Sequence, residues 1–175
     1  MPLTSHAFCL AHIGLAVTVV GISSMAAWAV HEKERLQIGE SMQVGNYTIT
    51  ALNAESLQGP NYISTAVTLG ISDVKGSELT PLVVENRRYP IEGRATAEGS
   101  LNNTIFRTIY ATVGEGDRER GWVIEAYYHP FVGWIWGGAL MMSFAGFLSL
   151  ADSRARNQIS SSNRSANTVN ALPIS

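Results

Sequence analysis

One histidine lies inside a long apolar run near the start of this 175-residue chain. The run is Phe8–Val30, and His12 is its one residue that titrates near neutral pH. A histidine within such a run is a candidate functional residue, because its imidazole is a good axial ligand for the iron of a haem. The alternative is a neutral histidine that hydrogen-bonds to a neighbouring helix.

The other histidines do not complete a bis-histidine iron site with His12. His6 projects from a different side of the same helix, and His31 lies about 28 Å further along it. His129 stands at the outer end of a second apolar run. If His12 binds iron, its partner ligand therefore comes from another polypeptide. A single cysteine, Cys9, excludes a disulfide framework and a C-x-x-C-H haem attachment motif.

Two apolar runs, Phe8–Val30 and Phe131–Ala151, are long enough to cross a bilayer, which takes about 20 residues. A cleaved signal peptide is the alternative for the first, since Ala27-Trp28-Ala29 resembles a cleavage site. The absence of Lys and Arg before Phe8 and the length of the run favour a retained span.

Basic residues after the second run set the expected orientation. Arg154 and Arg156 place the C-terminus in the cytoplasm. The N-terminus then also lies there, and the middle of the chain lies outside. The expected organisation is a short cytoplasmic N-terminus (1–7), a transmembrane helix (8–30), a periplasmic β domain (31–130), a second transmembrane helix (131–151) and a disordered cytoplasmic tail (152–175).

The middle segment is predicted to be all β. Alternating apolar and polar residues, rich in Thr, Val and Ile and separated by glycines, indicate six or seven short strands. Val44-Gly45-Asn46-Tyr47 predicts a hairpin turn, and residues 97–107 predict a short helix. The fold class is thus a membrane protein in which two transmembrane helices flank an extracytoplasmic small antiparallel barrel or sandwich.

Small residues recur along both apolar runs and favour close helix packing. In the first they share one face, which His12 does not join, and they are Ala7, Ala11, Gly14, Thr18 and Gly21. In the second they are Gly133, Gly137, Gly138 and Gly146. The two spans should pack together, with small-residue surface left for the helices of a partner.

Ordered motifs over residues 8–156 resemble the last segment of CcmF-type cytochrome c haem lyases. They are Ala11-His12-Ile13-Gly14-Leu15-Ala16-Val17, Gly39-Glu40-Ser41, Gly59-Pro60-Asn61-Tyr62, Glu85-Asn86-Arg87-Arg88-Tyr89, Glu98, Arg107-Thr108-Ile109-Tyr110-Ala111-Thr112-Val113-Gly114-Glu115 and Tyr127-Tyr128-His129-Pro130-Phe131-Val132-Gly133-Trp134-Ile135-Trp136-Gly137-Gly138. The chain departs from the family pattern at Ala97, Thr108, His129 and Gly133. It also lacks the family's long N-terminal part with its tryptophan-rich signature, as in a split lyase gene or a partial reading frame.

The resemblance implies a subunit of the haem lyase that attaches haem covalently to apocytochrome c. His12 falls on the position of an axial ligand to a membrane b-type haem, which this chain shares with a larger N-terminal CcmF-like chain. Further implied partners are the haem-delivery protein and apocytochrome c with its thiol-reducing factors. The implied location is the bacterial inner membrane, with the mitochondrial inner membrane as second choice. The chain is not expected to catalyse the reaction alone.

Two other functions stay open. The first is a non-catalytic assembly module of the same complex. The second is a membrane-anchored β domain that binds a ligand or protein outside. A net charge of −2 gives no indication of nucleic-acid binding. No Ser-His-Asp order, metal-ligand spacing or phosphate-binding loop indicates hydrolytic chemistry.

Overall fold

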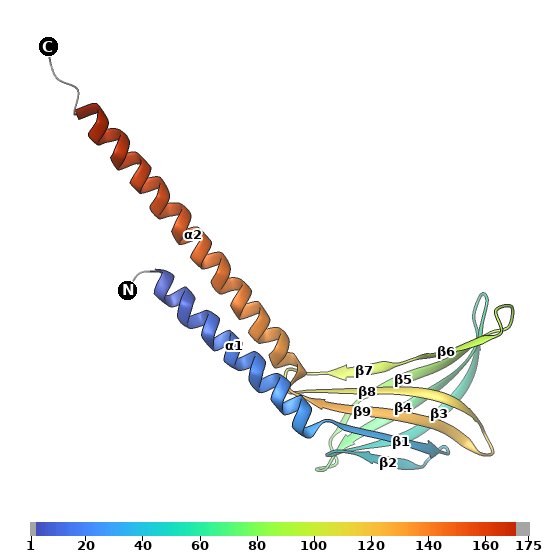
Figure 1. Ribbon diagram of the computed structural model, residues 1–175. Helices are drawn as coiled ribbons and strands as arrows, with labels where there is room; N and C mark the ends of the chain where they lie inside the picture. Colours follow the sequence, from blue (N-terminus) through green and yellow to red (C-terminus); the bar gives the residue numbers. More distant parts are fainter. Residues whose placement is uncertain (1–2, 171–175) are drawn as a thin grey trace. The chain divides into compact units, whose positions relative to one another are not determined.

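The computed structural model describes residues 3–170, and the side chains of residues 5–152. Helix α1 (Leu3–Trp28) precedes a run of β-strands, and helix α2 (Val132–Asn170) follows it (Figure 1). The strands are β1 (Val30–Leu36), β2 (Ser41–Val44), β3 (Tyr47–Gln58), β4 (Ile63–Asp73), β5 (Glu78–Tyr89), β6 (Arg94–Glu98), β7 (Ser100–Asn103), β8 (Arg107–Asp117) and β9 (Gly121–Pro130). The chain divides into two compact units, one of the helices up to Gly21 and from Trp134, and one over Ile22–Gly133.

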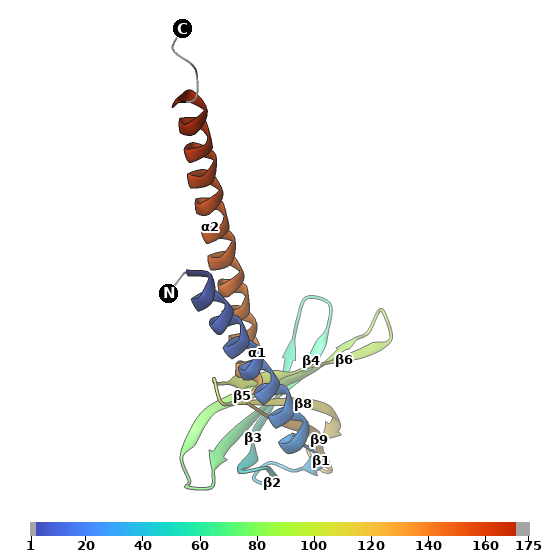
Figure 2. The same ribbon diagram turned by 60° about the vertical axis from the view of Figure 1, so that its left-hand side comes forward.

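The β unit consists of two antiparallel sheets (Figure 2). One has the order β1-β9-β8-β7 and the other the order β2-β3-β4-β5-β6. Fully buried apolar side chains from both sheets form one core, with Ile49 and Leu69 on one side and Ile109 and Ile124 on the other. Of the predicted barrel or sandwich, the sandwich is therefore the fold observed.

The predicted hairpin turn is confirmed. Val44 pairs with Tyr47, so β2 and β3 are joined by a two-residue loop. Gly45 has a φ of 60°, and Asn46 does not share the left-handed conformation. A glycine at the first of two central positions is the requirement of a type II′ turn, whose twist matches that of the strands.

The short helix predicted within residues 97–107 is wrong. The chain there forms the end of β6, which pairs with β5, and the whole of β7, which pairs with β8. Gly99 lies where the chain passes from one sheet to the other, and a Cβ at this position would meet the ring of Tyr110. Glycine at this position therefore allows the aromatic ring to lie against the backbone, and strand pairing replaces the predicted helix.

Strand β1 was not predicted, because its sequence VHEKERL lacks alternating apolar residues. It pairs with β9 from Val30↔Tyr128 to Leu36↔Trp122 and forms an edge of its sheet. Charged side chains along an edge strand discourage pairing with another chain.

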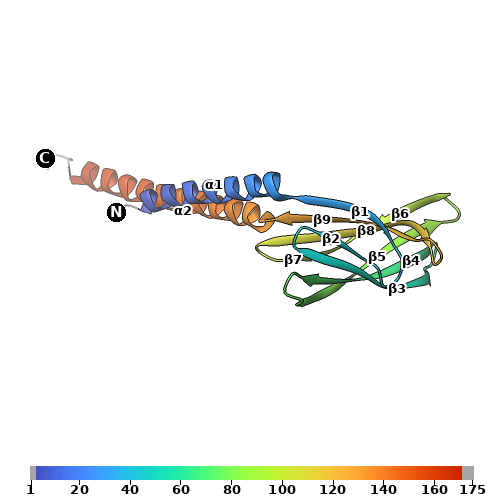
Figure 3. The same ribbon diagram turned by 90° about the horizontal axis from the view of Figure 1, so that it is seen from below.

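The two helices pack through part of the predicted small residues (Figure 3). Gly14 and Gly138 lie at the contact, whereas Gly133 packs against Ile105 and a Cβ at Gly137 would meet nothing within 4 Å. Gly14, Gly21 and Ala7 are buried, and Gly14 and Gly138 approach so closely that a Cβ at Gly14 would lie 2.8 Å from the Gly138 carbonyl oxygen. The predicted helix end at Ala151 and the disordered tail beyond it differ from the structure, since α2 continues to Asn170. No Gly or Pro interrupts the chain between Gly146 and Pro173, so nothing in the sequence stops the helix earlier. Residues 171–175 lie outside the described part.

Candidate functional site

His12 is held in one tautomer by its own helix. Its Nδ1 lies 2.9 Å from the carbonyl oxygen of Phe8, one turn earlier. A carbonyl oxygen only accepts, so Nδ1 carries the hydrogen and donates it, and the lone pair of the neutral ring resides on Nε2. The Phe8 ring lies against the imidazole with centroids 4.1 Å apart and further restricts its rotation.

The His12 side chain points away from the contact between the helices. His12 is exposed within the helix unit, whereas Gly14, two residues on, is buried against α2. A histidine that binds iron through one nitrogen commonly donates the other N–H to a backbone carbonyl. His12 therefore presents a free, oriented Nε2 of the kind that an axial haem ligand requires.

The remaining histidines lie as follows. His6 is exposed on α1, roughly 9 Å along the helix axis from His12. In the β unit, His31 donates to Glu125, and His129 has a buried Nδ1 with no hydrogen-bond partner among the described residues. No group of three or more His, Cys, Asp or Glu side chains that would hold a metal ion occurs in the described part of the chain. His12 thus offers one ligand, and the source of a second stays a prediction.

The outer face of β1 and β9 carries a polar cluster. The Tyr127 hydroxyl and His31 Nε2 donate to the same Glu125 oxygen, at 2.9 and 2.8 Å, and Lys33 Nζ lies 3.6 Å from the other. The hydrogen bond from Tyr127, then the one from His31 and the charge of Lys33, lower the pKa of Glu125, while the hydrogen bond to Glu125 raises the pKa of Tyr127. The cluster is a charged, hydrogen-bonded surface rather than a metal site.

The adjacent arginines Arg87 and Arg88 have different surroundings. Arg87 Nε donates to Glu85 at 2.9 Å, and its guanidinium lies 4.7 Å from the centre of the Tyr62 ring. Arg88 points to the other side of β5, where it lines a polar cavity together with Arg35 of β1. Sequence reasoning missed this cavity, because 52 residues separate the two arginines in the chain.

Gly133, where the family pattern has an arginine, lies close to the chain between β7 and β8. A Cβ there would stand 2.9 Å from the carbonyl oxygen and 3.1 Å from the Cα of Ile105. Before it, Phe131 has a φ of 56°, and its N–H donates to the Phe106 carbonyl oxygen. The glycine therefore permits a close approach that a larger residue would prevent.

The fold and the site define a helix-flanked antiparallel β-sandwich with one oriented imidazole available for a ligand. A model of the family "CcmF C-terminal beta-sandwich" matches residues 27–130. The chain belongs to this family, as the sequence motifs predicted.

Two relatives illustrate the extent of the similarity. The chain is 37% identical over 150 residues to the cytochrome c-type biogenesis protein CcmF of Escherichia coli (strain K12), covering 86% of this chain and 23% of that protein. It is 32% identical over 157 residues to the cytochrome c-type biogenesis protein ccl1 of Rhodobacter capsulatus, covering 90% and 24%. The chain thus spans about a quarter of the length of these relatives.

A solved structure of the cytochrome c heme lyase CcmF shares the fold. It superposes with a TM-score of 0.64 at 14% identity, over 82% of this chain and 24% of that one.

Proposed function

We propose that this chain acts in cytochrome c maturation, as one part of a haem lyase that attaches haem covalently to apocytochrome c. Membership of the CcmF C-terminal family and the printed names of its relatives support this role. Because those relatives are about four times longer, the activity belongs to the chain together with a larger N-terminal CcmF-like polypeptide. The haem-delivery protein, apocytochrome c and its thiol-reducing factors are the further proposed partners.

His12 is the proposed axial ligand of a b-type haem that this chain shares with the larger polypeptide. The observation that carries the assignment is the Nδ1–Phe8 hydrogen bond, which leaves Nε2 free and fixes the direction of its lone pair. The haem would supply electron transfer, and through it keep the substrate haem reduced for addition of the cysteine thiols. This chain would position one imidazole for the haem iron, and its partner would supply the other ligand.

Both helices are proposed to span the bacterial inner membrane, with the β-sandwich in the periplasm. The apolar segments Ser5–Trp28 and Val132–Asp152 are long enough, and only 17% and 11% of their most apolar windows are buried within the chain. A core helix of a water-soluble protein buries most of its apolar residues instead. Arg154 and Arg156 after the second span favour a cytoplasmic C-terminus.

The test is the visible absorption spectrum of the chain co-purified in detergent with a long CcmF-like chain. The expected result is a b-type haem spectrum that His12→Ala abolishes and His6→Ala, on the same helix, preserves. Haem retained in His12→Ala would assign the ligand to another residue. A stable complex without haem in the wild type would contradict the haem proposal and favour a non-catalytic assembly module.

A further inference from the structure

A cavity of about 300 Å³ opens beside the core of the β-sandwich. On β5, the inward-facing positions Leu82 and Val84 are buried in the core, and Asn86 and Arg88 continue the same side of the strand into the cavity. Trp122 of the facing sheet, 4% exposed, forms part of its lining. Polar and cationic side chains thus follow directly on the apolar core along this strand.

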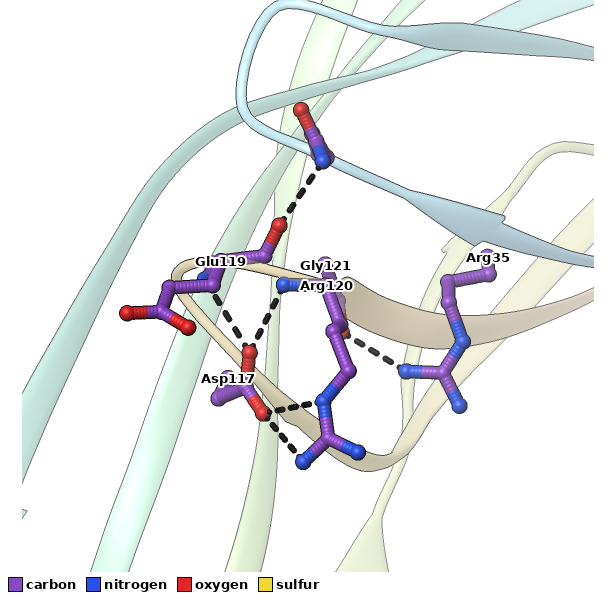
Figure 4. Close-up of polar contacts among 6 residues, drawn as sticks. Arg35, Asp117, Glu119, Arg120 and Gly121 are labelled. Atoms are coloured by element: carbon purple, nitrogen blue, oxygen red, sulfur yellow. Dashed lines mark hydrogen bonds and ion pairs between the residues drawn. The ribbon is translucent and has the colours of Figure 1, made fainter.

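Two arginines of the cavity lack a carboxylate partner. Arg35 Nη1 donates to the Gly121 carbonyl oxygen at 2.9 Å, which fixes its guanidinium and leaves other N–H groups free (Figure 4). The Arg88 side chain makes no hydrogen bond or ion pair with any described residue, while its backbone pairs with β4 and β6. Outside the cavity, Arg87 and Arg94 of the same sheet are paired with Glu85 and Glu92.

The carboxylates near the cavity do not neutralise these two arginines. Asp117 Oδ2 accepts from Arg120 Nε and Nη2 at 2.8 and 2.7 Å, and its Oδ1 accepts from the backbone N–H groups of Glu119 and Arg120 (Figure 4). These bonds, the backbone one from Arg120 foremost, lower the pKa of Asp117. Glu115 also lines the cavity, but it forms no ion pair with any described residue. Three arginines therefore face two carboxylates, which leaves the cavity positive.

The wall formed by β8 is open because its side chains are small. The pairing of β8 with β9 shifts register between Val113 and Gly116, which is a bulge. Gly114 and Gly116 flank Glu115 there and contribute backbone rather than side chains to the cavity. Neutral donors complete the lining, since Thr65 and Asn86 contribute a hydroxyl and an amide.

We propose that this cavity binds a carboxylate through Arg35 and Arg88. A guanidinium offers two parallel N–H groups that match the two oxygens of a carboxylate. The volume accommodates one acidic side chain or a small organic acid and lies at the low end for ligand sites. The carboxylate comes either from a Glu or Asp of a partner polypeptide or from a free acid, and the experiment separates these sources. The proposal does not depend on His12 or on haem.

The test is a nuclear magnetic resonance titration of the full chain in detergent, labelled with ¹⁵N at arginine and tryptophan. One probe is the blocked peptide acetyl-Gly-Glu-Gly-amide, its uncharged counterpart is acetyl-Gly-Gln-Gly-amide, and the free acid is succinate. The expected result is a saturable shift of the Arg35 and Arg88 Nε–H and Trp122 indole signals. The glutamine peptide should cause none. Saturation with the peptide alone assigns the site to a partner side chain, and tighter binding of succinate assigns it to a free acid.

Variants make the result specific to the cavity. Arg88→Gln should raise the Kd about tenfold, since charge-assisted hydrogen bonds contribute most of such binding. Arg88→Lys should raise it less, because it keeps the charge and loses the fork. Arg94→Gln, at an exposed arginine already paired with Glu92, should leave the Kd unchanged. The absence of saturable shifts with both acidic probes, or equal Kd values for wild type and a folded Arg88→Gln, would overturn the proposal.

Discussion

The β-sandwich has a buried core of large apolar side chains, whereas the helix pair leaves most of its large apolar side chains exposed. Leu69 and Ile124 are fully buried in the sandwich, but Leu140 and Phe147 of α2 are 70% and 71% exposed. What the helices bury against each other is small, with Ala7 and Ala145 at 3% and 2%. The sandwich therefore forms its own apolar core, while the helix pair is held by close backbone contact and leaves a large apolar surface uncovered.

The largest expected effect is on the sandwich core. Leu69→Ala should lower the free energy of unfolding of the sandwich by about 2–5 kcal/mol, because it leaves a cavity in a packed core. The control Leu57→Ala removes the same atoms from a side chain that is 44% exposed, and should have little effect. Urea unfolding of the full chain in detergent, followed by the ¹⁵N-indole signal of Trp122, measures both. An equal loss of unfolding free energy in both variants would mean that Leu69 and Leu57 do not differ as interior and surface residues.

The distance between the two helices should change when a larger side chain is introduced at their contact, rather than when a side chain is shortened. A side chain at Gly138 would meet Thr18 and the Gly14 carbonyl, whereas one at Gly137 would meet nothing within 4 Å. Gly138→Leu should therefore push the helices apart by roughly 2 Å, within the range of helix–helix spacings. The distance between spin labels on Cys9 and Leu150→Cys measures the change. Gly137→Leu should leave this distance as in the wild type, and a shift of the same size would contradict small-residue packing.

A substitution at Gly133 tests at which residue of α2 the β unit ends and the helix unit begins. Gly133 is helical but belongs to the β unit, and Gly133→Ala should destabilise the sandwich by about 1 kcal/mol through overpacking against Ile105. Gly137→Ala has no such neighbour and should gain about 0.5–1 kcal/mol of helix propensity. Thermal unfolding of the sandwich measures the first change. If Gly133→Ala stabilised the sandwich instead, the backbone around Ile105 would have moved to make room for the added methyl group.

The smallest effect concerns the polar cluster of Glu125, Tyr127, His31 and Lys33 on the surface of the sandwich. The Tyr127 hydrogen bond lowers the pKa of Glu125 below 4.5, so the stability it contributes is present above this pH and is lost as the pH falls through the lowered value. Tyr127→Phe should raise the pKa of Glu125 towards 4.5. Carbon-13 titration of the carboxyl group measures the shift. Tyr89→Phe, on the other sheet, should leave the titration unchanged, and a lack of response to Tyr127→Phe would assign the shift to His31 and Lys33.

Composition and the spacing of apolar residues along the sequence predicted most of the fold. The apolar runs identified both helices, and alternation with glycine punctuation identified the longer strands and the Gly45 turn. Strand β1 was missed because its exposed residues are charged, so that pairing with β9 alone makes it a strand. The segment after Ala151 was predicted to be disordered from its Ser and Asn content, although no Gly or Pro interrupts it before Pro173 and α2 continues to Asn170.

The site was predicted only in part. His12 stood out because a titrating residue is unusual in an apolar run, but its tautomer depends on the Phe8 contact, which requires coordinates. Arg88 belongs to the Glu85–Tyr89 motif and Arg35 to a charged stretch, but the sequence did not indicate that the two arginines share a cavity. Only the sheet topology brings them to one cavity, and it depends on pairings between residues far apart in the sequence.

The pairing of β1 with β9 also determines how the sandwich responds to a pulling force. Both chain connections of the sandwich leave from the same end of neighbouring strands, where Val30 is paired with Tyr128. A pull that separates these connections loads the backbone hydrogen bonds one pair after another, beginning at Val30, rather than all together. Under such a load the sandwich would open by peeling β1 from its edge, at low force, while the remaining strands of both sheets stay packed.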